Sequence, residues 1–99
     1  MSDIIRHVFV RGRVQGVGYR AWLADEAVAR GLAGWVRNRT DGAVEAVLSG
    51  PADAVSAIID TCQRGPSMAR VSAVDHEVAN EDMMMLRKHG ERFSVLPTV

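Results

Sequence analysis

The sequence has few of the residues that staple a small secreted domain or hold a metal ion. Cys62 is the single cysteine, so no internal disulfide can form, and this favours a reducing compartment, the cytoplasm. The three histidines are far apart, and no HxxxH, CxxC or carboxylate series occurs, so we expect no metal and no cofactor. No serine lies in a nucleophile elbow, which argues against Ser-His-Asp catalysis.

Long hydrophobic runs and an excess of charge are also missing. No window approaches the length of a membrane span, and the N-terminus carries no export signal, so we expect no membrane partner. The net charge is zero, which argues against a general nucleic-acid coat protein. A chain of 99 residues with 47% hydrophobic residues is expected to form a single domain over residues 1–99.

The charges are unevenly distributed along this neutral chain. Residues 1–40 contain seven arginines and three acidic residues, whereas residues 41–99 contain five basic and nine acidic residues. The positive half also contains a glycine-rich turn. This distribution is suited to binding a small anion.

The turn is the segment Gly12 to Arg20, which reads GRVQGVGYR and leads from an apolar strand into a helix. Glycines permit backbone conformations in which successive N–H groups converge on one point at a helix N-terminus. Arg20 in the first helical turn opposes the helix dipole, at a cost of roughly 0.3–1 kcal/mol unless an anion lies in front of the helix. Taken alone, however, Arg20 is better interpreted as one of many surface arginines.

Hydrophobic periodicity and turn signals predict the elements along the chain. A helix over residues 20–30 ends at Gly31, Asp41-Gly42 joins two strands as a hairpin, and Pro51 opens a second helix. In that helix Val55, Ile58, Ile59 and Cys62 share one face, so Cys62 is expected in the core rather than as a nucleophile. The expected strands cover residues 4–10, 33–38, 43–49, 70–78 and 93–95, and residues 79–92 are expected to be irregular.

Up to residue 78 this order is a split βαβ pattern, βαββαβ, and the short strand 93–95 follows it. The pattern predicts an α+β fold with an antiparallel sheet and both helices on one face. The apolar phase slips between Val71 and Val74, which indicates a β-bulge in that strand.

Residues 16–21 also match G-x-G-x-x-A, the dinucleotide-binding fingerprint. That fold requires the next strand to run parallel, whereas Asp41-Gly42 turns the chain straight back. Moreover, 99 residues cannot supply two nucleotide-binding halves. The match therefore does not indicate a dinucleotide site.

Asn38 is a second polar residue of interest, at the end of the strand that reads GWVRN. Asparagine is frequent before hairpin turns because its side chain bonds to the local backbone. The residue by itself therefore favours a turn role.

Taken together, these segments resemble the acylphosphatase family. The similarity runs through GRVQGVGYR, GWVRN and DGAVE, then Gly50-Pro51, Gly65-Pro66, Ala69-Arg70-Val71 and Phe93-Ser94-Val95, and so covers nearly the whole chain. Tyr19 stands where phenylalanine is more usual in the family. Residues 79–92 and 96–99 follow no clear family pattern.

The resemblance implies a ferredoxin-like, acylphosphatase-like domain that hydrolyses the carboxyl–phosphate bond of a small-molecule acyl phosphate without a metal. It implies that Arg20 binds the substrate and that Asn38 positions the attacking water. It also implies that the phosphoryl oxygens are bound by the backbone N–H groups of Gln15, Gly16, Val17, Gly18, Tyr19 and Arg20.

Two alternatives use the same fold. A non-catalytic phosphate- or RNA-binding module is one, but base stacking needs strand aromatics, and here only Trp35, Phe93 and Phe9 are available. The other is a domain that binds an acyl or carbamoyl phosphate for a larger enzyme. The ends at Met1 and Val99 favour a stand-alone protein, which we expect to be a monomer.

Overall fold

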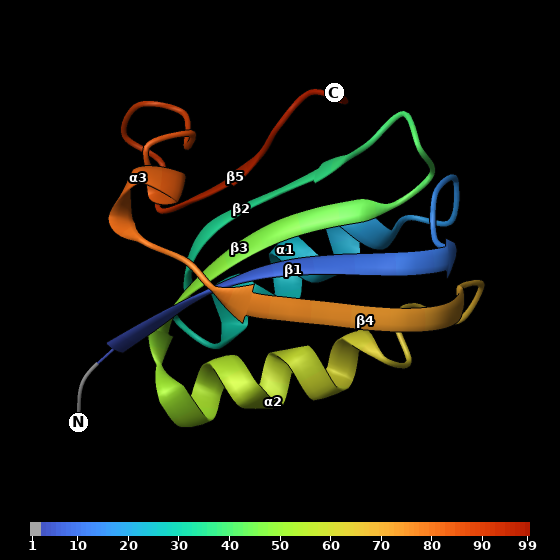
Figure 1. Ribbon diagram of the computed structural model, residues 1–99, viewed down its shortest axis with the longest axis horizontal. Coiled ribbons are helices and arrows are strands. Elements are labelled where there is room, and N and C mark those ends of the chain that lie inside the picture. Colours follow the sequence, from blue (N-terminus) through green and yellow to red (C-terminus); the bar gives the residue numbers. More distant parts are fainter. Residues whose placement is uncertain (1–2) are drawn as a thin grey trace.

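A computed structural model describes residues 3–99 of the protein. Five strands and three helices follow one another along the chain (Figure 1). In order they are β1 (Asp3–Arg13), α1 (Tyr19–Ala29), β2 (Ala33–Asn38), β3 (Val44–Pro51), α2 (Ala52–Cys62), β4 (Arg70–Val78), α3 (Glu81–Met84) and β5 (Phe93–Val95).

The strands form one sheet in the order β4-β1-β3-β2-β5. The expected antiparallel pairing is confirmed for β4, β1, β3 and β2, but β5 runs parallel to β2, so the sheet is mixed. The reason lies in the connection after β4. It carries the chain across to the other edge of the sheet and reverses its direction once, so β5 arrives with the polarity of β2 (Figure 1).

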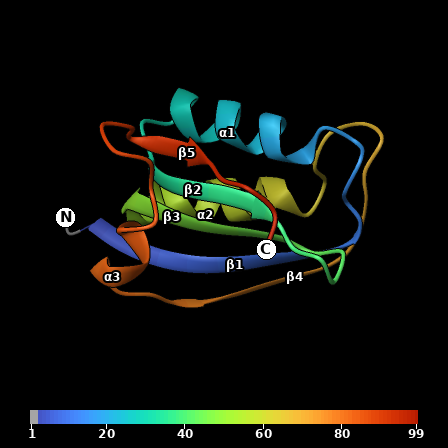
Figure 2. The ribbon, with the colours of Figure 1, turned by 90° about the horizontal axis from the view of Figure 1, so that it is seen from above.

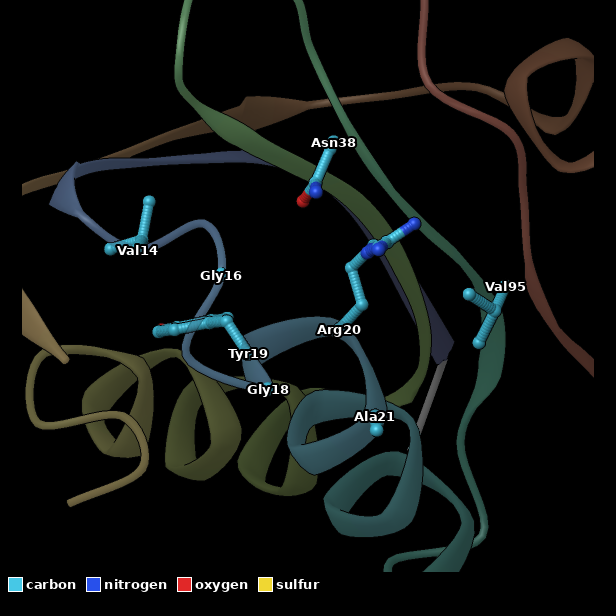
Figure 3. A pocket seen from close by; sticks show the side chains of 8 residues that line it. All are labelled: Val14, Gly16, Gly18, Tyr19, Arg20, Ala21, Asn38 and Val95. Carbon is cyan, nitrogen blue, oxygen red and sulfur yellow. The ribbon is translucent and has the colours of Figure 1, made fainter. Parts of the chain in front are cut away.

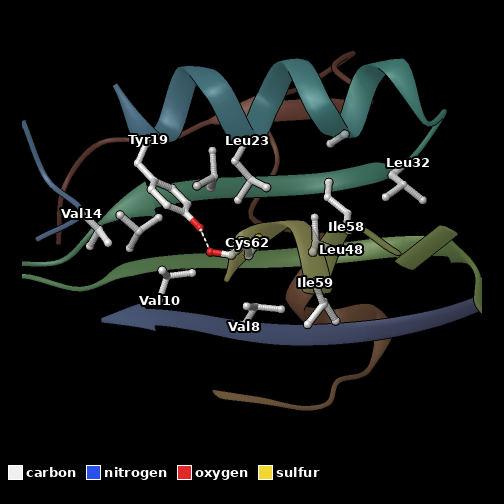
Figure 4. Packing of buried hydrophobic residues seen from close by; sticks show 14 of the residues in the cluster. Val8, Val10, Val14, Tyr19, Leu23, Leu32, Leu48, Ile58, Ile59 and Cys62 are labelled. Atoms are coloured by element: carbon white, nitrogen blue, oxygen red, sulfur yellow. Dashed lines mark hydrogen bonds between the residues drawn. The ribbon is translucent and has the colours of Figure 1, made fainter. Parts of the chain in front are cut away.

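Helices α1 and α2 pack on the same face of the sheet, as expected (Figure 2). Their buried residues meet alternating residues of the central strands, among them Val8 and Val10 of β1 and Leu48 of β3 (Figure 4). Because strand side chains alternate between faces, the same strands present a second set to the opposite side. There Trp35, Val47, Met84 and Leu96 form a smaller cluster.

The glycine and proline signals fall at the helix ends. Gly31, with φ 70°, follows α1, and the Leu32 N–H donates to the Ala27 carbonyl at 2.9 Å, which is the Schellman pattern. Pro51 is the N-cap of α2, and Cys62 ends that helix fully buried on the predicted apolar face. The expected core position of Cys62 is therefore confirmed.

The predicted bulge in β4 is present. Arg11 pairs with Ala73 and Gly12 pairs with Val71, so Ser72 has no opposite partner on β1. A Cβ on Gly12 would lie 2.3 Å from the Arg70 carbonyl oxygen. The bulge brings the two backbones closer than any side chain at position 12 would allow.

The prediction that residues 79–92 are irregular is wrong for one turn, α3. Asn80 caps this helix, since its Oδ1 accepts from the Asp82 N–H at 3.1 Å. Met84 is buried against the second cluster, and the Trp35 indole N–H donates to the Met83 carbonyl at 2.7 Å. Burial on Trp35, which lies far away in the sequence, stabilises a helix too short to be recognised from local periodicity.

Candidate functional site

The turn between β1 and α1 is built on two glycines in the left-handed region. Gly16 has φ 75° and Gly18 has φ 79°, a conformation that other L-residues adopt only with strain. Open space surrounds the position that a Cβ would take at either glycine. Backbone conformation, and not crowding, is therefore what requires glycine in this turn.

The start of α1 has free hydrogen-bond donors. Gly18 is the N-cap and contributes no side-chain cap, and within residues 3–99 the Tyr19 and Arg20 N–H groups find no acceptor. These donors and the helix dipole give this end of α1 a positive potential. The expected anion-binding geometry of the turn is thus compatible with its backbone.

A pocket of about 300 Å³ opens at this helix end (Figure 3). Its walls come from the turn, α1, the end of β2 and β5. Its lining residues are Val14, Gly16, Gly18, Tyr19, Arg20, Ala21, Asn38 and Val95. The fold therefore brings Arg20 and Asn38, 18 positions apart in the sequence, to one cavity.

Arg20 and Asn38 are both half-buried, and their side chains are available to a ligand in the pocket. Within residues 3–99 neither the Arg20 guanidinium nor the Asn38 side-chain amide makes a hydrogen bond or an ion pair. In Asn38 only the backbone is engaged, since its carbonyl accepts from the Val99 N–H at 3.2 Å and the residue pairs with Val44 of β3. Its side chain is thus not used for the local turn bonding that its sequence position favours.

Two other arginines of the first half, Arg37 and Arg39, are already paired with a carboxylate. Glu45 is buried on the face of the sheet opposite α1 and α2, where it accepts from Arg37 Nε at 2.8 Å and from Arg39 Nη1 at 3.1 Å. His7 Nε2 lies 2.6 Å from its second oxygen. Burial raises the pKa of Glu45, but the hydrogen bonds from Arg37, His7 and Arg39 outweigh burial and leave that pKa below the usual value. Arg20 has no such carboxylate among the described residues.

The side chains of three predicted site residues are engaged elsewhere in the fold. Gln15 and Val17 are not among the lining residues: the Gln15 side chain bonds to the β2–β3 hairpin, and Val17 packs against the core. The Tyr19 ring is buried, and its hydroxyl donates to the Cys62 carbonyl at 2.7 Å (Figure 4). Only the backbone N–H groups of these residues can face a ligand in the turn.

The sequence reasoning missed Val14, Ala21 and Val95 as parts of the pocket wall. Ala21 adjoins Arg20, and Val14 lies within the glycine turn, so a search of neighbouring positions could have found both. Val95 carries no signal, because only the pairing of β5 with β2 brings it there.

Burial keeps two groups near the pocket protonated, the Cys62 thiol and the Tyr19 phenol. Burial raises the pKa of the Cys62 thiol to about 11, and it also raises the pKa of the Tyr19 phenol, so neither is a nucleophile or base near neutral pH. Within residues 3–99 no three side chains of histidine, cysteine, aspartate or glutamate gather as a metal site. Helices α1 and α2, of 11 residues each, are the longest described helices, and neither could span a membrane.

Comparison with known proteins gives one consistent result. The family model described as Acylphosphatase matches residues 6–94. The chain is 64% identical to an acylphosphatase of Rhodopseudomonas palustris over 99 residues, which is all of both chains. Two acylphosphatase structures are also similar. The structure from Bacillus subtilis has a TM-score of 0.80 and 34% sequence identity, and the match covers 94% of this chain and 98% of that one. The structure from Coxiella burnetii has a TM-score of 0.81 and 32% sequence identity, and the match covers 95% of this chain and 93% of that one.

Proposed function

Because this chain belongs to the acylphosphatase family, we propose that Arg20 and the backbone N–H groups of residues 15–20 bind the phosphoryl group of an acyl phosphate, and that Asn38 positions the attacking water. The reaction is hydrolysis of the carboxyl–phosphate bond, which yields a carboxylate and inorganic phosphate. One observation carries the assignment: a single pocket holds Gly16, Gly18, Arg20 and Asn38, and the side chains of Arg20 and Asn38 lack partners within residues 3–99.

Charge supports the role of Arg20. A phosphoryl group in front of α1 would meet the helix N-terminus, the free N–H groups of the turn and an unpaired guanidinium together. The guanidinium fork can donate two parallel hydrogen bonds to phosphoryl oxygens. Arg20 then no longer opposes the dipole, since both act on the same negative charge.

The demands of the reaction match this small set of groups. Phosphoryl transfer depends mainly on positioning and on stabilisation of charge, which backbone N–H groups and one arginine can supply. The leaving group is a carboxylate, a weak base that departs without a general acid. We therefore propose that a phosphoryl oxygen of the substrate accepts the proton of the incoming water, and that no metal is needed.

Two measurements test the proton path and the metal. The pH dependence of the rate is expected to show no enzyme group of near-neutral pKa. A pH dependence that is set by such a group, and that disappears when this group is mutated, would contradict the proposed proton path. Activity is expected to survive EDTA. A loss that a divalent ion restores would rule out the metal-free reaction.

The deciding experiment follows hydrolysis of benzoyl phosphate by the wild type, Arg20→Ala, Arg20→Lys and Arg64→Ala. Arg64 is the matched control, an exposed arginine in the loop after α2. We expect Arg20→Ala to lose turnover and phosphate binding, Arg20→Lys to recover little because the fork is lost, and Arg64→Ala to match the wild type. Near-normal turnover by Arg20→Lys would disprove the role of the guanidinium as a donor of two parallel hydrogen bonds. Inactivity of the wild type would favour a phosphate-binding module.

We also propose that the chain acts as a single-domain monomer in the cytoplasm, without nucleic-acid partners. One sheet connects Asp3 to Val95, the one cysteine is buried and reduced, and the charges balance. Light scattering on the protein as it elutes from a size-exclusion column measures its mass directly. A mass of twice 10.8 kDa would contradict the proposed monomer.

A further inference from the structure

The Gln15 side chain links the phosphate loop, residues 15–20, to the β2–β3 hairpin. Its Nε2 donates to the Arg39 carbonyl at 2.7 Å and to the Ala43 carbonyl at 2.9 Å. A side-chain amide has two N–H bonds, so one group serves both acceptors. Figures 1 and 2 both show the β1–α1 loop beside this hairpin.

The two acceptors lie opposite each other at the neck of the hairpin. The Arg39 N–H donates to the Ala43 carbonyl at 2.9 Å, and the Gly42 N–H donates to the Arg39 carbonyl at 3.1 Å. Gln15 therefore adds a third and a fourth bond to a neck that its own backbone already closes. Asn38 is the residue that immediately precedes this neck.

The end of β2 is supported from its other sides as well. Glu45 binds the side chains of Arg37 and Arg39, which flank Asn38, and the Val99 N–H donates to the Asn38 carbonyl at 3.2 Å. These contacts hold β2 to β3 and to the C-terminal segment, but they do not reach the phosphate loop. Gln15 supplies that link from within the loop itself.

We propose that Gln15 is a positioning residue. Through the hairpin neck, its side chain fixes the position of the Asn38 amide relative to the phosphate site at Arg20. This inference rests on the proposed roles of Arg20 and Asn38. The Gln15 side chain touches no substrate in it, and the backbone N–H of residue 15 stays in the loop when the side chain changes.

The kinetic consequence is a selective effect on turnover. An attacking water must lie in line with phosphorus, and a misplacement of about 1 Å can cost on the order of 100-fold in rate. Phosphate binding uses only the loop, the helix end and Arg20. Loss of the two hydrogen bonds from the Gln15 side chain should therefore lower kcat and leave phosphate affinity nearly unchanged.

The test compares Gln15→Met, which keeps the length and loses both donors, with Gln63→Met as the matched control. Gln63 is an exposed glutamine at the end of α2. We expect Gln15→Met to lower kcat for benzoyl phosphate about 10-fold or more, while the inhibition constant of inorganic phosphate changes less than about threefold. Gln63→Met should change neither. Equal losses of kcat and phosphate affinity, or no loss, would overturn the proposal.

A double-mutant cycle separates positioning from general loosening. If Gln15 acts through Asn38, then Gln15→Met in an Asn38→Ala background should lower kcat by less than about twofold further. A full second loss would show that Gln15 acts independently of Asn38 and would refute the inference. If Asn38→Ala alone leaves kcat unchanged, the proposed role of Asn38 fails first, and the inference with it.

A milder variant keeps the test decisive if Gln15→Met does not fold. Gln15→Asn retains the amide but is one methylene too short to reach both carbonyls. The same selective loss of kcat, smaller in size, is expected. Wild-type kcat with a folded Gln15→Asn would count against a positioning role.

Discussion

The Tyr19 hydroxyl donates a 2.7 Å hydrogen bond to the Cys62 carbonyl, 43 residues further along the chain. Tyr19 is the first residue of α1 and Cys62 the last of α2, so the bond ties the start of one helix to the end of the other. The ring also fills the space under Gly65, where an added Cβ would lie 2.6 Å from it. The residue that begins the helix of the proposed phosphate site is thereby anchored in the core.

Alkaline pH should weaken this anchor. Burial raises the pKa of the Cys62 thiol from 9.0 to about 11 and raises that of the Tyr19 phenol above its usual 10.0. Between pH 9 and 11 the unfolded thiol loses its proton while the folded thiol keeps it, so the free energy of unfolding falls as pH rises, by up to about 1.4 kcal/mol per pH unit. Tyr19 adds to this fall above its usual value.

Urea denaturation across pH 8–11 measures the effect in the wild type, Cys62→Ala and Tyr19→Phe. Each substitution should flatten the alkaline decline, and Tyr19→Phe should also lower stability by about 1–2 kcal/mol at neutral pH because the Cys62 carbonyl loses its donor. If the free energy of unfolding falls with pH as steeply in both variants as in the wild type, the buried, protonated Cys62 and Tyr19 are not the cause of the decline.

Asn38→Ala should lower kcat much more than phosphate affinity, because the amide is proposed to hold water and not phosphate. Turnover of benzoyl phosphate and inhibition by inorganic phosphate measure the two effects. Asn80→Ala is the matched control: it removes the cap of α3, which costs about 1 kcal/mol of stability, and should leave kcat intact. Equal losses of kcat and affinity in Asn38→Ala would make Asn38 a plain binding residue.

Gly18→Ala should impair phosphate binding beyond its effect on stability. Gly18 and Gly90 have φ 79° and 83°, and both have open space at the Cβ position, so alanine should cost each about 1–2 kcal/mol of backbone strain. Only Gly18 lies in the phosphate loop. Isothermal titration with inorganic phosphate should show weaker binding for Gly18→Ala and wild-type binding for Gly90→Ala; matched affinities would argue against a conformational role of the loop.

Glu45→Gln should destabilise the protein by about 1.5–3 kcal/mol at pH 7, since the charge that binds Arg37, Arg39 and His7 is lost. The pKa of Glu45 is lowered, so its stabilisation is fully present above its usual 4.5 and is lost as pH falls through the lower folded value. Glu45→Gln should therefore flatten the acid decline in stability, whereas exposed Glu77→Gln should not. Urea denaturation from pH 3 to 7 measures this effect. Parallel curves of unfolding free energy against pH for the wild type and Glu45→Gln would refute the role of Glu45 in the acid decline.

Short-range patterns in the sequence were enough to predict most local elements and an anion-binding turn. Gly16 and Gly18 impose the turn, Gly31 ends α1, Asp41-Gly42 makes the hairpin, and the spacing that ends at Cys62 shows the buried face of α2. Conformational preference and periodicity act over a few residues, so they can be read without a structure. The resemblance to the family added Arg20 and Asn38 as candidate site residues.

How these elements meet could not be predicted from short-range patterns. The parallel pairing of β5, the burial that orders α3, the contribution of Val95 to the pocket and the bonds from Gln15 to the hairpin all join residues distant in sequence. Such contacts depend on how the helices and strands pack, and a single sequence carries no local signal of its long-range partners. The same packing supports the proposed positioning role of the Gln15 side chain, which is separate from the backbone role that the family resemblance implies for this residue.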